Sequence, residues 1–165
     1  MTDESTDSAG ELPARSLLVQ RALRRAGIDS EIIVLPDAAA TAAAAAAALG
    51  ADVGAIANSL VFDGDGEPLL VMTSGAHRVD TGALAARLGR GRIRRATPEQ
   101  VRAATGQVIG GVAPTGHPAP IETIVDEALA VHPLLWAAAG TPHTMFALTF
   151  DQLVALTGGT VHRVD

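Results

Sequence analysis

The chain of 165 residues contains no cysteine, and all twelve of its basic side chains are arginines. Without cysteine, the protein has no disulfides, no thiolate nucleophile and no sulfur-ligated metal. Without lysine, it has no side-chain amine for amine chemistry. The lack of cysteine agrees with a cytoplasmic location, which we expect for this chain.

Aromatic residues make up only 2% of the chain, so few rings are available to stack on bases or cofactors. The longest apolar run, the alanine tract 42–48, falls well short of the roughly 20 residues that a membrane-spanning helix needs. The five histidines have no spacing typical of metal ligands. We therefore expect no membrane span, no metal and no cofactor.

Negative charge is concentrated at the N-terminus. Residues 1–11 hold four acids and no base, and they lack the basic and apolar segments of a signal peptide. This composition predicts a disordered acidic tail over residues 1–12. The remainder has 14 acids against 12 arginines, so it is close to neutral. We expect it to form one domain over residues 13–165.

Helical and strand-like patterns are interleaved without a strict βαβ rhythm, which predicts an α+β domain with a mixed sheet flanked by helices. The Asp-Gly pairs of residues 63–67 predict a tight hairpin turn. The expected helices are 12–28, Asp37 to Gly50, a short one at 52–57, 82–88, 99–105 and 150–156. The expected strands include 31–35, 59–62, 68–73 and 160–164, and three further apolar segments at 121–129, 134–140 and 144–149 alternate with turns.

Ser74, His77 and Asp80 form a sequence pattern that could be taken for a catalytic triad. Three side chains on one strand-to-helix turn point in different directions, so they seldom converge. Asp80 is instead predicted to cap the helix that follows it.

The stretch GGVAPTGHP at residues 110–118 is the strongest candidate for a binding loop. Consecutive glycines allow the backbone to approach a ligand and direct N–H groups toward an ester or carboxylate oxygen. A tight loop that needs positive φ angles explains the same residues equally well. His117 and His143 lie in loops bounded by glycine and proline, where they are either pocket residues or exposed loop residues.

An isolated amide and a cluster of arginines are two further candidate features. Asn58 is the one amide in an apolar stretch, ADVGAIANSLVF, and six arginines lie between residues 87 and 102 against a single acid, Glu99. The arginines could attract a phosphate backbone. An ordinary solvated surface is the alternative.

Several segments, in order, resemble the YbaK/prolyl-tRNA editing domain family over residues 14–160: ALGADVGAIANSLVF, PLLVMTSGAHRVD, ATPEQVRAATGQVIGGVAPTGHP, IVDEAL and WAAAGTPHTMFALTFDQLVALTGG. The Gly-x-x-x-Pro element, Gly110 to Pro114, is the most specific of these. The resemblance implies a strongly twisted mixed sheet and hydrolysis of mischarged aminoacyl-tRNA. Family members act as free-standing proteins or as an insertion domain of prolyl-tRNA synthetase.

The resemblance also implies roles for individual residues. Asn58 stands where characterised members carry a lysine that is essential for deacylation and is thought to hold the 3′ end of the substrate. Asn58, Gly110 and His143 would thus be catalytic, while Arg92, Arg94 and Arg95 would bind tRNA. The residues expected to bind substrate are Gly111, Val112, Ala113, Pro114, Gly116, His117, Gly140 and Thr144.

The expected partner is the acceptor end of an aminoacyl-tRNA, with an aminoacyl-tRNA synthetase as a further candidate partner. The missing lysine leaves an alternative open: a non-catalytic module that binds an aminoacyl end or an amino-acid derivative. A hydrolase for another small ester or amide is a third possibility.

Overall fold

The computed structural model describes residues 12–36 and 41–165. Residues 1–11 of the predicted acidic tail and Asp37, the predicted start of the alanine-rich helix, lie outside these ranges. Leu12, the last residue of the predicted tail, instead packs against the core. The described α-helices are α2 (Ala14–Arg25), α3 (Ala42–Leu49), α4 (Thr81–Leu88), α5 (Pro98–Thr105) and α6 (Phe150–Thr157). Two 3₁₀ helices are also present, η1 (Val53–Ala55) and η2 (Glu127–Val131).

Eight described strands form one mixed sheet in the order β1-β7-β6-β2-β3-β5-β8, with β4 paired to β2 outside this path. This arrangement of one mixed sheet with flanking helices confirms the predicted α+β class. The strands are β1 (Ile33–Val34), β2 (Ile56–Gly64), β3 (Glu67–Ser74), β4 (Ile93–Arg95), β5 (Glu122–Asp126), β6 (Leu135–Ala138), β7 (Thr144–Leu148) and β8 (Thr160–His162).

Local sequence signals fix most element boundaries. The β2–β3 hairpin turns through Asp65 and Gly66, whose φ angles are 55° and 93°, and such left-handed values are those that Asp-Gly turns supply. The Asp80 carboxylate accepts a hydrogen bond from the N–H of Ala83 at 3.0 Å, which confirms the predicted cap of α4. Thr97 and Thr149 begin α5 and α6 with capping boxes.

Three predicted elements differ from the structure. The short helix expected at 52–57 is only the turn η1, because β2 already begins at Ile56. The alanine-rich helix α3 begins at Ala42, and its N-cap is Thr41. The prediction placed the cap at Asp37. The segment 121–129 divides into β5 and the start of η2, since the Asp126 carboxylate accepts from the Ala128 N–H and starts a 3₁₀ turn.

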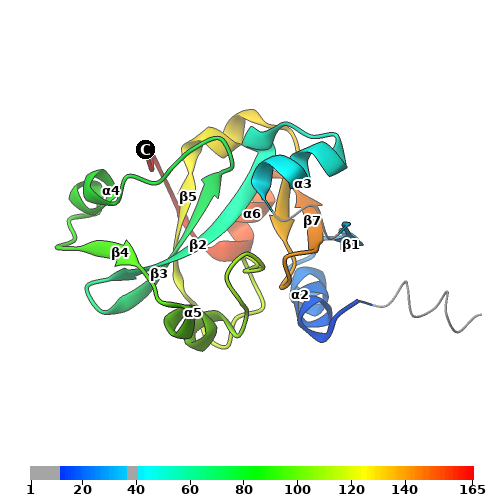
Figure 1. Ribbon diagram of the computed structural model, residues 1–165, viewed down its shortest axis with the longest axis horizontal. Coiled ribbons are helices and arrows are strands. Elements are labelled where there is room, and N and C mark those ends of the chain that lie inside the picture. The colour runs from blue at the N-terminus through cyan, green and yellow to red at the C-terminus, as the bar shows by residue number, and fades with distance from the viewer. Residues whose placement is uncertain (1–11, 37–40) are drawn as a thin grey trace, which may run out of the picture.

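The sheet is covered on both faces (Figure 1). On one face a large core cluster joins α2, α5 and α6 to alternate residues of β2, including Ala57 and Val61. On the other face α4 packs over Phe62, while α3 packs over Ile56. Asn58 and Leu60 share this second face, because side chains alternate along a strand. They therefore lie between the areas that α3 and α4 cover.

One edge of β2 is interrupted. β3 pairs with β2 along its whole length. On the opposite edge, β6 pairs only with Ile56 and Ala57, and β4 begins to pair at Phe62. No described strand pairs with residues 58–61 on this edge, and the contact there is one hydrogen bond of 3.2 Å from the N–H of Ala96 to the carbonyl of Val61. None of the described helices is long and apolar enough to cross a membrane.

Candidate functional site

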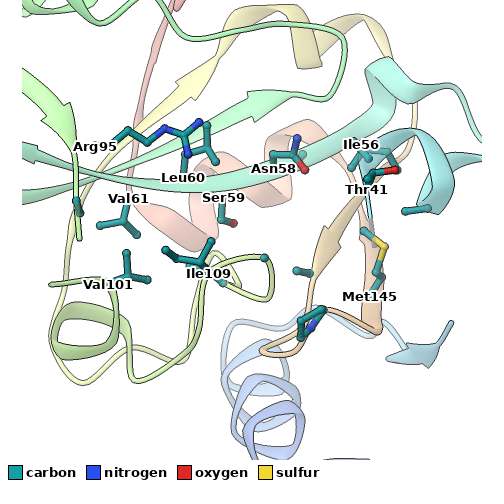
Figure 2. A pocket seen from close by; sticks show the side chains of 18 residues that line it. Thr41, Ile56, Asn58, Ser59, Leu60, Val61, Arg95, Val101, Ile109 and Met145 are labelled. Atoms are coloured by element: carbon teal, nitrogen blue, oxygen red, sulfur yellow. The ribbon is translucent and has the colours of Figure 1, made fainter. Parts of the chain in front are cut away.

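A cavity of about 270 Å³ opens at the gap in the edge of β2. Its walls come from β2, the ends of β4 and β6, α3, α5 and the loop after α5 (Figure 2). Most of the 18 lining residues are small and apolar. The lining residues with polar side chains are Thr41, Asn58, Ser59 and Arg95.

The side chains of β2 enter this cavity from two sides. In Figure 2, Asn58 projects to one side of the strand, and Ser59 and Val61 project to the other side toward Ile109 and Val101. The Ser59 hydroxyl donates a hydrogen bond to the sulfur of Met72 at 3.2 Å. The Asn58 amide makes no hydrogen bond to another described residue, so it remains free to act as both a donor and an acceptor.

The backbone of β2 adds two more polar groups. The carbonyl of Ile56 points toward β3, where it accepts from the N–H of Gly75 at 2.7 Å, and the carbonyl of Val61 points to the other edge. Because these directions alternate along a strand, the N–H and carbonyl of Ser59 also point to the other edge. The cavity is therefore bordered by an unpaired backbone donor and acceptor of Ser59.

The first half of the predicted binding loop forms one wall. Gly110 lies at the cavity with a φ angle of 89°. A Cβ atom on Gly111 would lie 2.6 Å from backbone atoms of Thr141, so only glycine fits there. The N–H of Gly111 donates to the carbonyl of Val108 at 2.9 Å. Gly111 therefore serves close packing between two loops, while its own N–H is engaged within the turn.

The second half of the loop lies elsewhere. Pro114, Gly116 and His117 line a separate hollow of about 470 Å³ between α2 and α6. His117 donates from Nε2 to the carbonyl of Ala113 at 2.8 Å, and burial lowers the pKa of its imidazole. The buried N–H of Ala113 donates to the side-chain oxygen of Gln107 at 2.7 Å. These predicted substrate residues thus hold the loop together and do not line the cavity.

Gly140 and Thr144 are also structural in this conformation. Gly140 has a φ angle of 97°, and a Cβ there would lie 3.1 Å from the backbone of Arg15. The fully buried Thr144 hydroxyl lies 2.9 Å from the hydroxyl of Ser16 and 2.7 Å from that of Thr141. The network fastens the segment after β6 to α2. Ser16 has no sequence signal, because its partners lie more than 120 residues away.

His143 lies beside the cavity without lining it. Its chain neighbour Pro142 is a lining residue, and its own carbonyl accepts from the N–H of Leu35 at 2.7 Å. The buried Nδ1 atom of His143 has no hydrogen-bond partner among the described residues. Buried polar atoms are seldom left unpaired, so this nitrogen is available to a water or a ligand.

The structure separates the three arginines that were expected to act together. Arg95 lines the cavity. Arg94 lies 3.5 Å from the carboxylate of Asp63. The pKa of Asp63 is lowered first by the Gly66 N–H, then by Gln100 and the nearby Arg94. Arg92 is exposed.

The Ser74, His77 and Asp80 pattern does not form a triad. The Ser74 hydroxyl donates to the carbonyl of Gly54 at 2.8 Å, and Asp80 caps α4. The Nδ1 atom of His77 lies 3.0 Å from a buried oxygen of Asp126. Within residues 12–36 and 41–165, no three His, Asp or Glu side chains gather as a metal site would require.

The model of the aminoacyl-tRNA editing domain family matches residues 36–156. The chain therefore belongs to this family, which confirms the resemblance found in the sequence. No curated protein sequence matches the chain.

Solved structures show the same fold. A crystal structure of a candidate trans-editing enzyme for prolyl tRNA synthetase is 42% identical, with a TM-score of 0.89 over 94% of this chain and 99% of that chain. A scaffold protein from work on computational epitope grafting is 38% identical, with a TM-score of 0.89 over 93% and 99%. A hypothetical protein is 25% identical, with a TM-score of 0.81 over 89% and 98%.

Proposed function

We propose that this protein is a trans-acting deacylase that hydrolyses the ester of a mischarged aminoacyl-tRNA. The observation that carries the proposal is the small cavity at the gap in β2, which Asn58 and Gly110 both line, in a chain of the editing family. The similarity to a candidate trans-editing enzyme of nearly the same length adds support. The acceptor end of tRNA would be the partner, in the setting of a prolyl-tRNA synthetase system.

The lining side chains determine which mechanism is available. None of the lining residues that the structure describes is a carboxylate or an imidazole, so the cavity wall offers no general base. Catalysis would rest on positioning and on donors aimed at the developing oxyanion. The amide of Asn58 and the N–H groups of Gly110 and Ser59 are the candidates. The attacking group would be a water molecule or a hydroxyl of the substrate itself.

Asn58 would carry out the role of the family's lysine with less binding energy. A charge-assisted hydrogen bond is about twice as strong as a neutral one, so the loss is of the order of 1–2 kcal/mol. Asparagine retains a donor and an acceptor at the same place on β2. The exchange would therefore weaken substrate binding or slow the reaction without abolishing function.

The size of the cavity favours a small amino acid. Ala42, Ala45, Ala57 and Ala138 line it, and its volume is about 270 Å³. We propose alanine, serine or cysteine as the amino acid removed. Size alone would give modest discrimination, since one methylene group is worth about 1–3 kcal/mol in an apolar pocket.

The test is a deacylation panel. Purified protein is incubated with tRNAs charged with alanine, cysteine, serine or proline, and release of the amino acid is compared with a blank. One small amino acid should be released faster than the blank. If no charged tRNA is hydrolysed, the protein is not a deacylase for these substrates.

Asn58→Lys separates an enzyme from a binding module. In a working variant site, the substitution changes a rate that already exists, and the stronger charge-assisted hydrogen bond of lysine should raise that rate. If the natural protein only binds the aminoacyl end, Asn58→Lys should create activity from none. Ala86→Lys, on the exposed side of α4, is the matched control for one added charge.

A further inference from the structure

Among the described residues that line the cavity, Arg95 is the one with a charged side chain. It pairs in register with Phe62 across the antiparallel β2–β4 ladder, so the two side chains lie on the same face of the sheet. Asn58 and Leu60 also lie on that face, by strand alternation. In Figure 2 the guanidinium of Arg95 extends along β2 and lies close to Leu60.

No described carboxylate engages this guanidinium. Arg94 lies beside Asp63 and Arg90 bonds to Glu122, whereas Arg92 and Arg95 form no ion pair with a described residue. Of these four arginines, Arg95 is the one that lines the cavity. The described lining contributes no negative charge. A cation next to an apolar wall in a site without acids favours an anionic ligand group.

Asn58 and Arg95 are the two polar residues on this face, and the distance between their positions on the sheet suits a small ligand. Asn58 and Phe62, the register partner of Arg95, are four residues apart, or about 13 Å along the strand. The long Arg95 side chain covers part of this span above Leu60. In an aminoacyl nucleotide, the ester on the ribose 3′ oxygen and the 5′-phosphate likewise lie on either side of a compact sugar.

We propose that Arg95 binds the 5′-phosphate of the 3′-terminal nucleotide while Asn58 meets the aminoacyl ester. The inference rests on the proposed function, and it deepens it by naming the group that holds the nucleotide. The planar guanidinium bonds two phosphate oxygens at once. In a chain without lysine, the positive charge of the site thus comes from β4 instead of from position 58 of β2.

Binding of two ligands tests this assignment without any need for turnover. The ligands are adenosine 5′-monophosphate that carries alanine through a non-hydrolysable 3′-amide link, and the same compound without the phosphate. Titration calorimetry should give the wild-type protein at least about tenfold tighter binding for the phosphorylated ligand, the preference typical of a charged hydrogen bond. Arg95→Gln should remove that preference and leave affinity for the unphosphorylated ligand unchanged. Arg21→Gln, an exposed change on α2, should retain it.

Three results would overturn the assignment. Arg95→Gln could keep the phosphate preference, it could weaken both ligands equally, or the wild-type protein could bind neither. Equal binding of plain adenosine monophosphate or inorganic phosphate would assign the site to free anions instead of the aminoacyl end. The two proposals can fail separately. If the protein prefers the phosphorylated ligand but releases no amino acid from charged tRNA, the deacylase proposal fails and the assignment of Arg95 stands.

Discussion

The two halves of the loop after α5 have different surroundings. Ile109, Gly110 and Val112 line the cavity, and Gly110 is exposed there. Pro114, Gly116 and His117 face the second hollow, where His117 bonds to the carbonyl of Ala113. The first half of this loop thus forms a wall of the cavity. The second half, which we call the anchor, holds the loop in place through hydrogen bonds within the protein.

This difference separates binding from support. A ligand needs polar groups that no other described residue engages. At the cavity such groups lie on Asn58, Ser59 and Arg95, and Nδ1 of His143 lies beside it. The segment 139–144 resembles the anchor, because Thr144 is buried in a network of hydroxyl groups. Sequence motifs contain both kinds of residue, and only the fold separates them.

The largest effect is expected from Gly111→Ala, which disrupts the packing of the cavity loop against the segment 139–144. Its Cβ would lie 2.6 Å from the backbone of Thr141, so one of the two loops must move. We expect the free energy of unfolding to fall by about 1–3 kcal/mol, as for overpacked cores, and deacylation to be lost. Urea unfolding measures the first and release of amino acid from charged tRNA the second. In the control Gly82→Ala in α4, the new Cβ would make only an ordinary contact, 3.6 Å from a carboxylate oxygen of Asp80. It should leave deacylation unchanged and the free energy of unfolding unchanged or slightly higher.

Thr144→Val tests the support without touching the cavity. The shape is kept, but the hydroxyl between Ser16 and Thr141 is removed. The free energy of unfolding should fall by about 1–2 kcal/mol, the value of one or two buried hydrogen bonds. Thr160→Val, on an exposed residue of β8, should change it by less than about 0.5 kcal/mol. Equal effects of the two substitutions would contradict the network's role.

A smaller effect concerns His117 and pH. Because burial lowers the pKa of this imidazole in the folded protein, the unfolded chain takes up a proton first as the pH falls. The contribution of His117 is therefore complete above its unfolded pKa of about 6.5 and is lost as the pH falls from there toward the folded value. Urea unfolding at pH 7.5 and pH 5 should show a smaller loss of stability for His117→Gln than for the wild type. An equal loss in both proteins would count against an anchored imidazole.

The smallest effect is expected from Arg92→Gln, outside the cavity. If Arg92 contacts one phosphate of tRNA, its removal should flatten the plot of log K against log salt concentration by about 0.7–0.9. Hydrolysis of a small aminoacyl ester should stay unchanged, because Arg92 does not line the cavity. Filter binding across a salt series measures the slope. An unchanged slope would make Arg92 part of an ordinary solvated surface.

Local chemistry in the sequence was sufficient for most of the fold. Caps such as Asp80 and Thr97, and the turn at Asp65 and Gly66, act on neighbours within a few residues, so they are visible in the sequence. The start of β2 was predicted wrongly, since ADVGAIAN has helical composition and only pairing with β3 and β6 makes residues 56–58 a strand.

The site could be predicted only in part. Asn58 and Gly110 were named from the sequence, and both line the cavity. The polar edge at Ser59 depends on where β6 and β4 stop pairing with β2, which no local pattern contains. The separate position of Arg95 likewise depends on its register with Phe62.

Filling each hollow with one aromatic ring tests most directly whether the cavity at the gap in β2 is the editing site. Ala138→Phe fills the cavity from the end of β6, and Ala119→Phe places the same ring at the second hollow. The measurement is the rate of amino-acid release from charged tRNA by both variants and the wild type. The account predicts release by the wild type and by Ala119→Phe, and almost none by Ala138→Phe. Full activity of Ala138→Phe, or loss of activity in Ala119→Phe alone, would contradict it.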